Sequence, residues 1–268
     1  MTESNDVVLY EVQEGIAQVT LNRPDALNAW VPELGRAYLD RLEEADSSPD
    51  VRVIVVTGAG RGFCAGVDFG HLRDIYEGRA SADDDDSRPQ SLPRSLRKPV
   101  IAAINGGCAG LGFVMALMCD IRFAARGAKL TTAFARRGLV AEYGLAWVLP
   151  RLLGPSRALD ILLSARTLSA EEAHAMGLVD RLTEPGRAVE DAREYAAQLI
   201  RYSSPSSMAT IKRQVYDDLD RSFTGSMASA IEYMAQSFER PDFREGVQSF
   251  VEHREPTFEG LGSARAPT

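Results

Sequence analysis

Two spacings of apolar residues alternate along the first half of the chain. The segments 7–12 and 16–21 are rich in β-branched residues and are joined by Gln13-Glu14-Gly15, a pattern typical of a β-hairpin. Continuous apolar runs are typical of strands that are covered on both faces, and such runs occur at 51–57, 100–104 and 121–125. The pattern therefore predicts a sheet with buried central strands.

Helical spacing occurs between and after these strands. Leu34, Tyr38, Leu42 and Ala45 recur every three or four residues, which predicts a helix over 33–45. Further helices are expected at 68–76, 112–118, 145–152, 156–164, 169–176, 188–201, 206–219, 225–238 and 243–252. Strands mixed with helices and followed by a helical tail indicate an α/β core over residues 1–187 and a C-terminal helical region over 188–268.

The composition narrows the class of protein. The 268 residues are 45% hydrophobic and 25% charged, which excludes a disordered chain, a collagen and a coiled coil. The formal net charge of −8 argues against binding nucleic acid by counterion release. Cys64, Cys108 and Cys119 are too few for a disulfide scaffold and lack the spacing of metal ligands. We therefore expect reduced thiols, no metal site and a cytoplasmic location.

No segment is expected to enter a membrane. The first ten residues lack the basic region and the apolar run of a signal peptide. Residues 99–119 carry no charge and are long enough to span a bilayer, but Asn105 and four glycines interrupt them. A strand, a turn and a buried helix are expected there instead. Residues 80–90 include the run Asp83-Asp84-Asp85-Asp86, which predicts a solvated loop.

Two glycine-rich segments are candidates for binding. Gly60-Arg-Gly62-Phe-Cys-Ala65 follows a predicted strand and fits a dinucleotide-binding pattern, but the acidic residue expected about 20 residues later is missing. A plain turn is therefore favoured over a nucleotide site. Gly66 and Gly110 each follow a predicted strand, and glycines leave backbone N–H groups open to a ligand. Together they predict either an oxyanion hole or two tight turns, and spacing alone favours the turns.

The chain resembles the crotonase, or enoyl-CoA hydratase/isomerase, superfamily along nearly its whole length. The resemblance rests on LNRPDALNA (21–29), VIVVTGAGRGFCAGVDF (53–69), KPVIAAINGGCAGLG (98–112), ALMCDIRFA (116–124), SAEEAHAMGLVDRL (169–182) and FVEHREPTF (250–258). It implies an α/β protein of crotonase (ClpP/crotonase-like) fold, with a spiral core of repeated ββα units and a C-terminal helical trimerisation region. It also implies a homo-trimer or a hexamer of two trimers, and a coenzyme A thioester as substrate with no further cofactor.

The same resemblance assigns residues to the site. The N–H groups of Val67 and Leu111 correspond to the pair that holds the thioester oxygen and stabilises an enolate. Residues that correspond to the substrate and coenzyme A contacts are Arg23, Ala26, Leu27, Ala65, Asp68, Phe69, Gly70, Gly110, Val114 and Phe134. Asp68 is also expected to cap the helix that follows it.

The chain lacks the two glutamates that position and activate water in the hydratases of this family. Val114 and Phe134 stand at these positions, and neither side chain can move a proton. Glu142 matches an acidic residue that transfers protons in the dienoyl-CoA isomerase branch, and apolar neighbours would raise its pKa and suit it as a base. Alternatively, Glu142 forms a structural ion pair with Arg136, Arg137 or Arg151.

An enoyl-CoA isomerase, or a hydratase with atypical residues, is therefore the leading expectation. The alternatives are a non-catalytic acyl-CoA-binding protein and a thioester or C–C hydrolase on the same scaffold. The sequence favours plainer roles for three other residues: a surface helix position rather than a place in the acyl channel for His71, and structural positions for Asp120 and His174.

Overall fold

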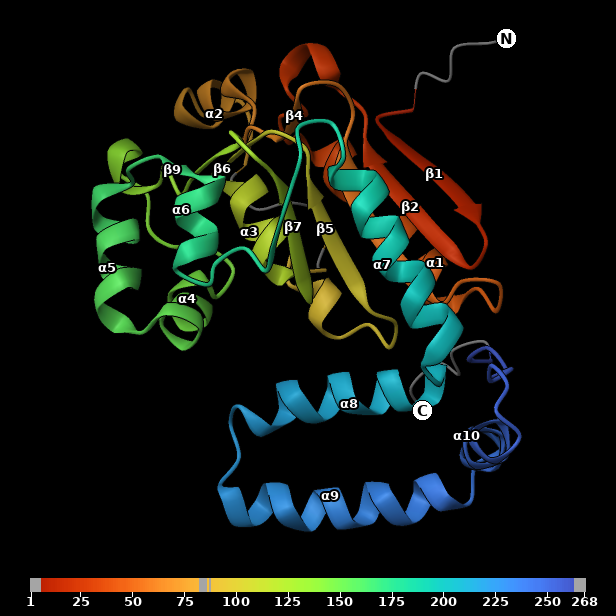
Figure 1. Ribbon diagram of the computed structural model, residues 1–268. Helices are drawn as coiled ribbons and strands as arrows, with labels where there is room; N and C mark the ends of the chain where they lie inside the picture. The colour runs from red at the N-terminus through yellow and green to blue at the C-terminus, as the bar shows by residue number, and fades with distance from the viewer. Residues whose placement is uncertain (1–5, 82–85, 87, 263–268) are drawn as a thin grey trace, which may run out of the picture.

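The computed structural model describes residues 6–81, 86 and 88–262, and its core contains two sheets. The larger sheet has the order β1-β2-β3-β5-β7-β10, and all neighbours are parallel except β1 and β2. Its strands are β1 (Val8–Gln13), β2 (Ile16–Leu21), β3 (Val53–Gly58), β5 (Val100–Ile104), β7 (Ile121–Ala125) and β10 (Arg181–Thr183). The predicted hairpin and the three predicted buried strands are all present (Figure 1).

The smaller sheet has the order β4-β6-β8-β9, and the sequence pattern did not predict it. Its strands are β4 (Gly62–Cys64), β6 (Gly107–Ala109), β8 (Lys129–Thr131) and β9 (Leu168–Ser169). Residues 62–64 were expected in a loop and 107–109 in a turn. These expectations were wrong because strands of two or three residues are too short to show an alternating pattern, and four neighbouring segments stabilise each other by pairing.

The chain alternates between the two sheets, adding one strand to the larger sheet and then one to the smaller sheet. Each of β3, β5 and β7 in the larger sheet is followed by β4, β6 or β8 in the smaller one. The first two passages then enter helices α2 (Phe69–Tyr76) and α3 (Leu111–Met118). This is the ββα spiral that the resemblance implied, and it brings the ends of successive small strands to one edge.

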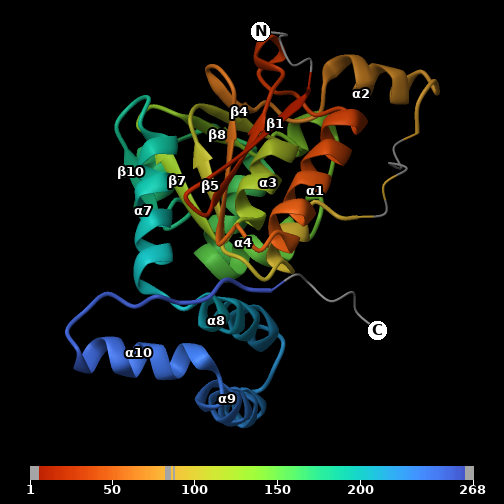
Figure 2. The ribbon, with the colours of Figure 1, turned by 90° about the vertical axis from the view of Figure 1, so that its right-hand side faces the viewer.

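Helices cover both faces of the larger sheet because its strands are apolar on both sides (Figure 2). Ile54, Val56 and Ala102 belong to the cluster that includes α1 (Pro32–Ser47) and α3. The alternate residues of the same strands face α7 (Ala188–Tyr202) through its residues Ala188, Ala192 and Ala196. Small alanine side chains at this spacing let α7 lie close to the sheet.

The last three helices leave the sheets and form what we call the C-terminal arm (Figures 1 and 2). The arm contains α8 (Pro205–Asp218), α9 (Phe223–Phe238) and α10 (Pro241–Val251). The division expected at residues 187/188 falls before α7, which packs on the sheet, so the helices that leave the core begin one helix later. The helices between β8 and β10 are α4 (Leu145–Leu153), α5 (Pro155–Ser164) and α6 (Ala170–Ala175).

Two expectations about other segments can be compared with the structure. Residues 99–119 contain the expected strand (β5) and the expected buried helix (α3), with β6 in place of part of the expected turn. No helix within the described ranges has the length and apolar character needed to cross a bilayer. Three residues of the aspartate run, Asp83, Asp84 and Asp85, lie outside the described residues.

Candidate active site

The two glycine-rich turns lie side by side. Strands β4 and β6 are parallel neighbours, so the turns that follow them leave the same edge of the small sheet. Gly66 has a φ of +91°, and a Cβ atom there would lie 2.9 Å from the carbonyl oxygen of Ala109. Gly110 has a φ of +51° and donates its N–H to the carbonyl of Thr131 at 3.0 Å. Glycine is needed at Gly66 both for its backbone conformation and for this close approach.

The residue after each glycine keeps its backbone N–H unused. Trp30 donates its N–H to the Gly66 carbonyl at 2.7 Å and accepts the Asp68 N–H at 2.9 Å. These two backbone bonds lie on either side of Val67 and leave its own N–H unused. Leu111 is the first residue of α3, where an N–H has no partner within the helix. Neither N–H donates to any residue that the structure describes. Both residues line one cavity.

This cavity has a volume of about 190 Å³ and a largely apolar wall. Side chains of α2 and of the segment 132–143 close it opposite the glycine turns. Its lining includes Trp30, Val67, Phe69, His71, Leu72, Ile75, Leu111, Phe134, Leu139 and Tyr143. Ala133 and Tyr143 hold left-handed backbone conformations that are costly for residues other than glycine, and such strain often accompanies a functional site.

Glu142 is the one acidic side chain among the described residues that line this cavity. It lies in the turn before α4, is half-buried, and has no ion pair in the described part of the chain. Burial raises the pKa of the Glu142 carboxyl above its usual range, since the charged form loses hydration. A carboxylate of this kind is a better proton acceptor than one exposed to water.

The three arginines considered as partners of Glu142 make other contacts. Arg136 donates to the carbonyl of Ser164 at 3.0 Å. The guanidinium of Arg137 lies 5.1 Å from the centre of the Phe69 ring, and that of Arg151 lies over Trp147. Within the ranges that the structure describes, none of the three therefore forms the alternative ion pair with Glu142.

The structure brings some of the expected site residues to the cavity and not others. Those that line it are Ala65, Val67, Phe69, Gly110, Leu111, Phe134 and Glu142. Arg23 lies outside the lining and pairs with Asp68 at 3.2 Å, while Asp68 caps α2 by accepting the Gly70 N–H at 2.8 Å. The cap is as predicted.

Ala26, Leu27 and Val114 also lie outside the cavity lining. Ala26 ends a short 3₁₀ helix, and Leu27 follows it and accepts the N–H of Ala65 at 3.0 Å, which fixes the first glycine turn. Val114 is fully buried in the core on α3. These residues support the wall of the site through the backbone or the core.

Sequence reasoning missed much of the apolar wall. Trp30, Leu72, Ile75 and Thr132 line the cavity, and His71 does so as well, although a surface position was favoured for it. The residues come from separate loops and helices and share no motif. The one available signal was the amphipathic pattern of α2, which leaves Leu72 and Ile75 on one side of a short helix.

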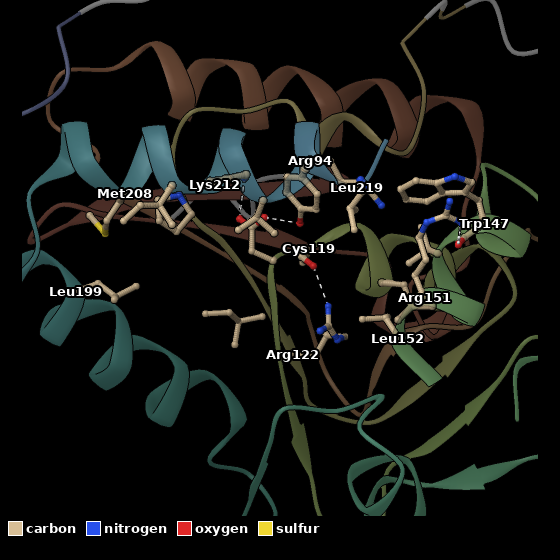
Figure 3. Close-up of a pocket in the computed structure, with 18 of the residues that line it drawn as sticks. Arg94, Cys119, Arg122, Trp147, Arg151, Leu152, Leu199, Met208, Lys212 and Leu219 are labelled. Carbon is tan, nitrogen blue, oxygen red and sulfur yellow. Dashed lines mark hydrogen bonds and ion pairs between the residues drawn. The ribbon is translucent and has the colours of Figure 1, made fainter. Parts of the chain in front are cut away.

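A larger cavity of about 440 Å³ lies at the other end of α3, beside α8 (Figure 3). Asp120 and Lys212 in this cavity are already paired: Lys212 contacts Asp120 at 2.7 Å, and the Tyr216 hydroxyl donates to Asp120 at 2.7 Å. Arg122 donates to the carbonyls of Leu178 and Cys119. The smaller cavity holds unpaired donors and an unpaired acid, so it is the better candidate for chemistry.

Comparison with known proteins agrees with the geometry. The family model for enoyl-CoA hydratase/isomerase matches residues 11–261. The chain is 33% identical over 266 residues to the 1,2-epoxyphenylacetyl-CoA isomerase of Escherichia coli K12, covering 95% of this chain and 99% of that relative.

Solved structures agree in the same way. An enoyl-CoA hydratase from Mycobacterium tuberculosis H37Rv superimposes with a TM-score of 0.86 at 30% identity, over 96% of this chain and 100% of that one. The enoyl-CoA hydratase EchA12_1 from Mycobacterium marinum is 51% identical with a TM-score of 0.70, over 81% of this chain and 100% of that one. The chain is therefore an enzyme of the enoyl-CoA hydratase/isomerase family.

Proposed function

We propose that the protein is an enoyl-CoA isomerase that moves a double bond through an enolate. The observation that carries this proposal is the pairing of one unpartnered carboxylate, Glu142, with two unpartnered N–H donors on one small apolar cavity. Isomerisation by a 1,3-proton shift needs one group that takes a proton at one carbon and returns it at another. A hydratase divides acid and base work between two carboxylates.

The proposed reaction uses each group once in each direction. Glu142 removes a proton from C2 of a 3-enoyl-CoA, and the electrons of that C–H bond enter a dienolate that extends to the thioester oxygen. The N–H groups of Val67 and Leu111 stabilise the negative charge on this oxygen. Protonated Glu142 then returns the proton to C4, and the double bond stands between C2 and C3. Coenzyme A is part of the substrate, and no further cofactor is required.

The positions Val114 and Phe134 argue against efficient hydration. Val114 is buried in the core and Phe134 presents a ring to the cavity, so neither can hold or activate water. The relatives' names do not decide between these reactions: the Escherichia coli relative is named as an isomerase of an epoxide, and the Mycobacterium relatives carry the name hydratase. Two alternatives remain to be tested: a non-catalytic acyl-CoA-binding protein and a thioester or C–C hydrolase.

One set of assays separates these functions. Conversion of 3-enoyl-CoA to 2-enoyl-CoA, followed by ultraviolet absorbance, is expected to be efficient. Hydration of crotonyl-CoA should stay below ~10⁴ M⁻¹s⁻¹ in kcat/KM, the low end of ordinary enzyme efficiency. Release of free coenzyme A, followed with a thiol reagent, would indicate a hydrolase instead. Calorimetric binding of acetoacetyl-CoA without any turnover would indicate a binding protein, and tight binding of NAD would contradict the proposed ligand class.

We also propose that the C-terminal arm joins chains into a trimer or a hexamer. The arm carries large apolar side chains with little cover in the single chain: Phe223 is 82% exposed, Ile231 67% and Phe250 80%. Burial of such residues in an interface removes apolar surface from water, which favours association. Light scattering at micromolar concentration tests the proposal, and a monomer would contradict it.

A further inference from the structure

Trp30 connects the first glycine turn to the helices around the cavity. Its backbone is bonded to Gly66 and Asp68, and its indole is 5% exposed and lines the cavity. The ring centre lies 5.9 Å from that of His71 on α2, in an edge-on arrangement. The indole is therefore a fixed part of the wall that an acyl group would meet.

The indole rests against a glycine inside α1. A Cβ atom on Gly35 would lie 2.6 Å from the Trp30 Nε1 atom and 2.8 Å from Cε2 and Cζ2. Contacts this short are not tolerated, so any other residue at this position would displace the ring. Glycine inside a helix destabilises the helix by about 1 kcal/mol relative to alanine, and φ at Gly35 lies outside the left-handed region that would require it. Space for the indole is what the glycine provides.

We propose that Gly35 is a positioning residue that sets which acyl groups the cavity accepts. It lies outside the cavity lining and acts through Trp30: with glycine at position 35 the indole sits back against α1, and with alanine it must move toward the cavity and His71. The inference rests on the proposed function in one respect, namely that the cavity holds the acyl part of a coenzyme A thioester. The class of substrate concerned is an acyl group long enough to reach the indole.

Calorimetry on the full-length protein tests this directly. Octanoyl-CoA and butyryl-CoA are saturated thioesters that the isomerisation cannot consume, so their dissociation constants report the cavity alone. Gly35→Ala should weaken octanoyl-CoA binding by about 10-fold or more relative to its effect on butyryl-CoA, since one methylene in an apolar pocket is worth about 10–200-fold. With 3-enoyl-CoA substrates of the same two lengths, kcat/KM should change in the same ratio.

Two further variants make the test independent of folding. Gly246 is also inside a helix, but a Cβ there would meet only ordinary contacts at 3.9 Å from Phe258, so Gly246→Ala should leave both dissociation constants unchanged. Trp30→Leu removes the ring that a methyl group at position 35 would displace. It should increase octanoyl-CoA affinity relative to butyryl-CoA, and adding Gly35→Ala to it should change that ratio no further.

The outcomes separate this inference from the proposed function. If wild type binds both thioesters but isomerises nothing, the proposed function fails and the binding ratios still test the role of Gly35. Equal weakening of both thioesters in Gly35→Ala would mean that the glycine turn has moved instead, and would overturn the inference. An unchanged ratio of the octanoyl-CoA and butyryl-CoA dissociation constants in Trp30→Leu would overturn it as well. This second test applies even if Gly35→Ala does not fold.

Discussion

The polar groups near the two ends of α3 differ in whether they have hydrogen-bond or ion-pair partners. At its first residue, Leu111, the backbone N–H has no partner among the described residues, and Glu142 on the same cavity has none either. Just beyond its last residue, Asp120 accepts bonds from Lys212, Tyr216 and the N–H of Val100, each at 2.7 Å. Lys212 also donates to the carbonyls of Pro93 and Lys98.

This difference is our reason for proposing the first end as the site of chemistry and the second as a structural contact between α8 and the core. Groups that are satisfied within the chain hold α8 to the core and have no capacity left for a ligand. Groups left unpaired next to apolar surface cost free energy in the empty protein, and a substrate that pairs with them recovers it. The size of a cavity carries less information, since the larger of the two lies at the structural end.

The largest expected effect is on the rate of isomerisation. Glu142→Gln keeps the shape of the side chain and removes the base, so kcat for a 3-enoyl-CoA should fall by about 10²–10⁴. Affinity for a saturated acyl-CoA should barely change, because the N–H groups of Val67 and Leu111 remain. The measurement is steady-state kinetics beside calorimetry.

Glu239 provides the matched control for that experiment. It is an exposed glutamate on the C-terminal arm, and Glu239→Gln should leave kcat unchanged. Wild-type turnover by a folded Glu142→Gln protein would exclude Glu142 as the base.

At the structural end, the same kind of change should reduce stability instead. Lys212→Met leaves Asp120 without its cation, and breaking a buried pair of this type typically costs about 3–5 kcal/mol. Chemical denaturation should show the loss, while kcat per folded chain stays as in wild type. Arg213→Met, an exposed neighbour on α8 whose guanidinium lies 4.9 Å from the centre of the Tyr233 ring, should reduce stability by no more than about 1 kcal/mol. A specific loss of kcat in Lys212→Met would remove the distinction between the two ends.

An intermediate effect is expected from the first glycine turn. In Gly66→Ala, the new Cβ would approach the Ala109 carbonyl to 2.9 Å in a backbone conformation that alanine resists, so the Val67 N–H should turn away from the cavity. Loss of one such donor typically lowers kcat by about 10²–10³. Gly127→Ala, at a positive φ with open space around it, controls for backbone strain alone. Equal losses in both variants would contradict the role of the N–H.

The sequence predicts the long elements well, because the buried strands are visible as apolar runs. The family resemblance around Gly66 and Gly110 points to Val67 and Leu111, and both of these residues line the same cavity. The short strands β4, β6, β8 and β9 could not be predicted, since two or three residues carry no periodic signal and their pairing is stabilised only in the folded chain.

The residues of the cavity wall could not be predicted from local sequence patterns either. Trp30, Leu72 and Thr132 meet there from separate segments, and the position of Trp30 depends on Gly35, a contact that no local pattern reveals. The sequence also contains no signal that α7 belongs with the sheet rather than with the helices after the expected division at residues 187/188. Ala188, Ala192 and Ala196 form a narrow face of small residues that packs on the sheet, whereas the helical pattern by itself does not separate this helix from the arm.

The smallest expected effect is the change in stability on replacing Glu142, and its sign is opposite to that of Lys212→Met. Burial raises the pKa of Glu142 in the folded chain, so the folded state binds that proton more tightly than the unfolded state does. Stability contributed by this group therefore falls as pH rises from the ordinary carboxyl pKa through the raised one, and at neutral pH the charged form carries its full cost. Glu142→Gln removes this cost and should raise the melting temperature slightly at neutral pH, with a gain that disappears as the pH falls below the ordinary range of a glutamate. A melting temperature lowered at neutral pH would instead indicate a stabilising ion pair in solution, and Glu142 would then belong with Asp120 among the structural groups.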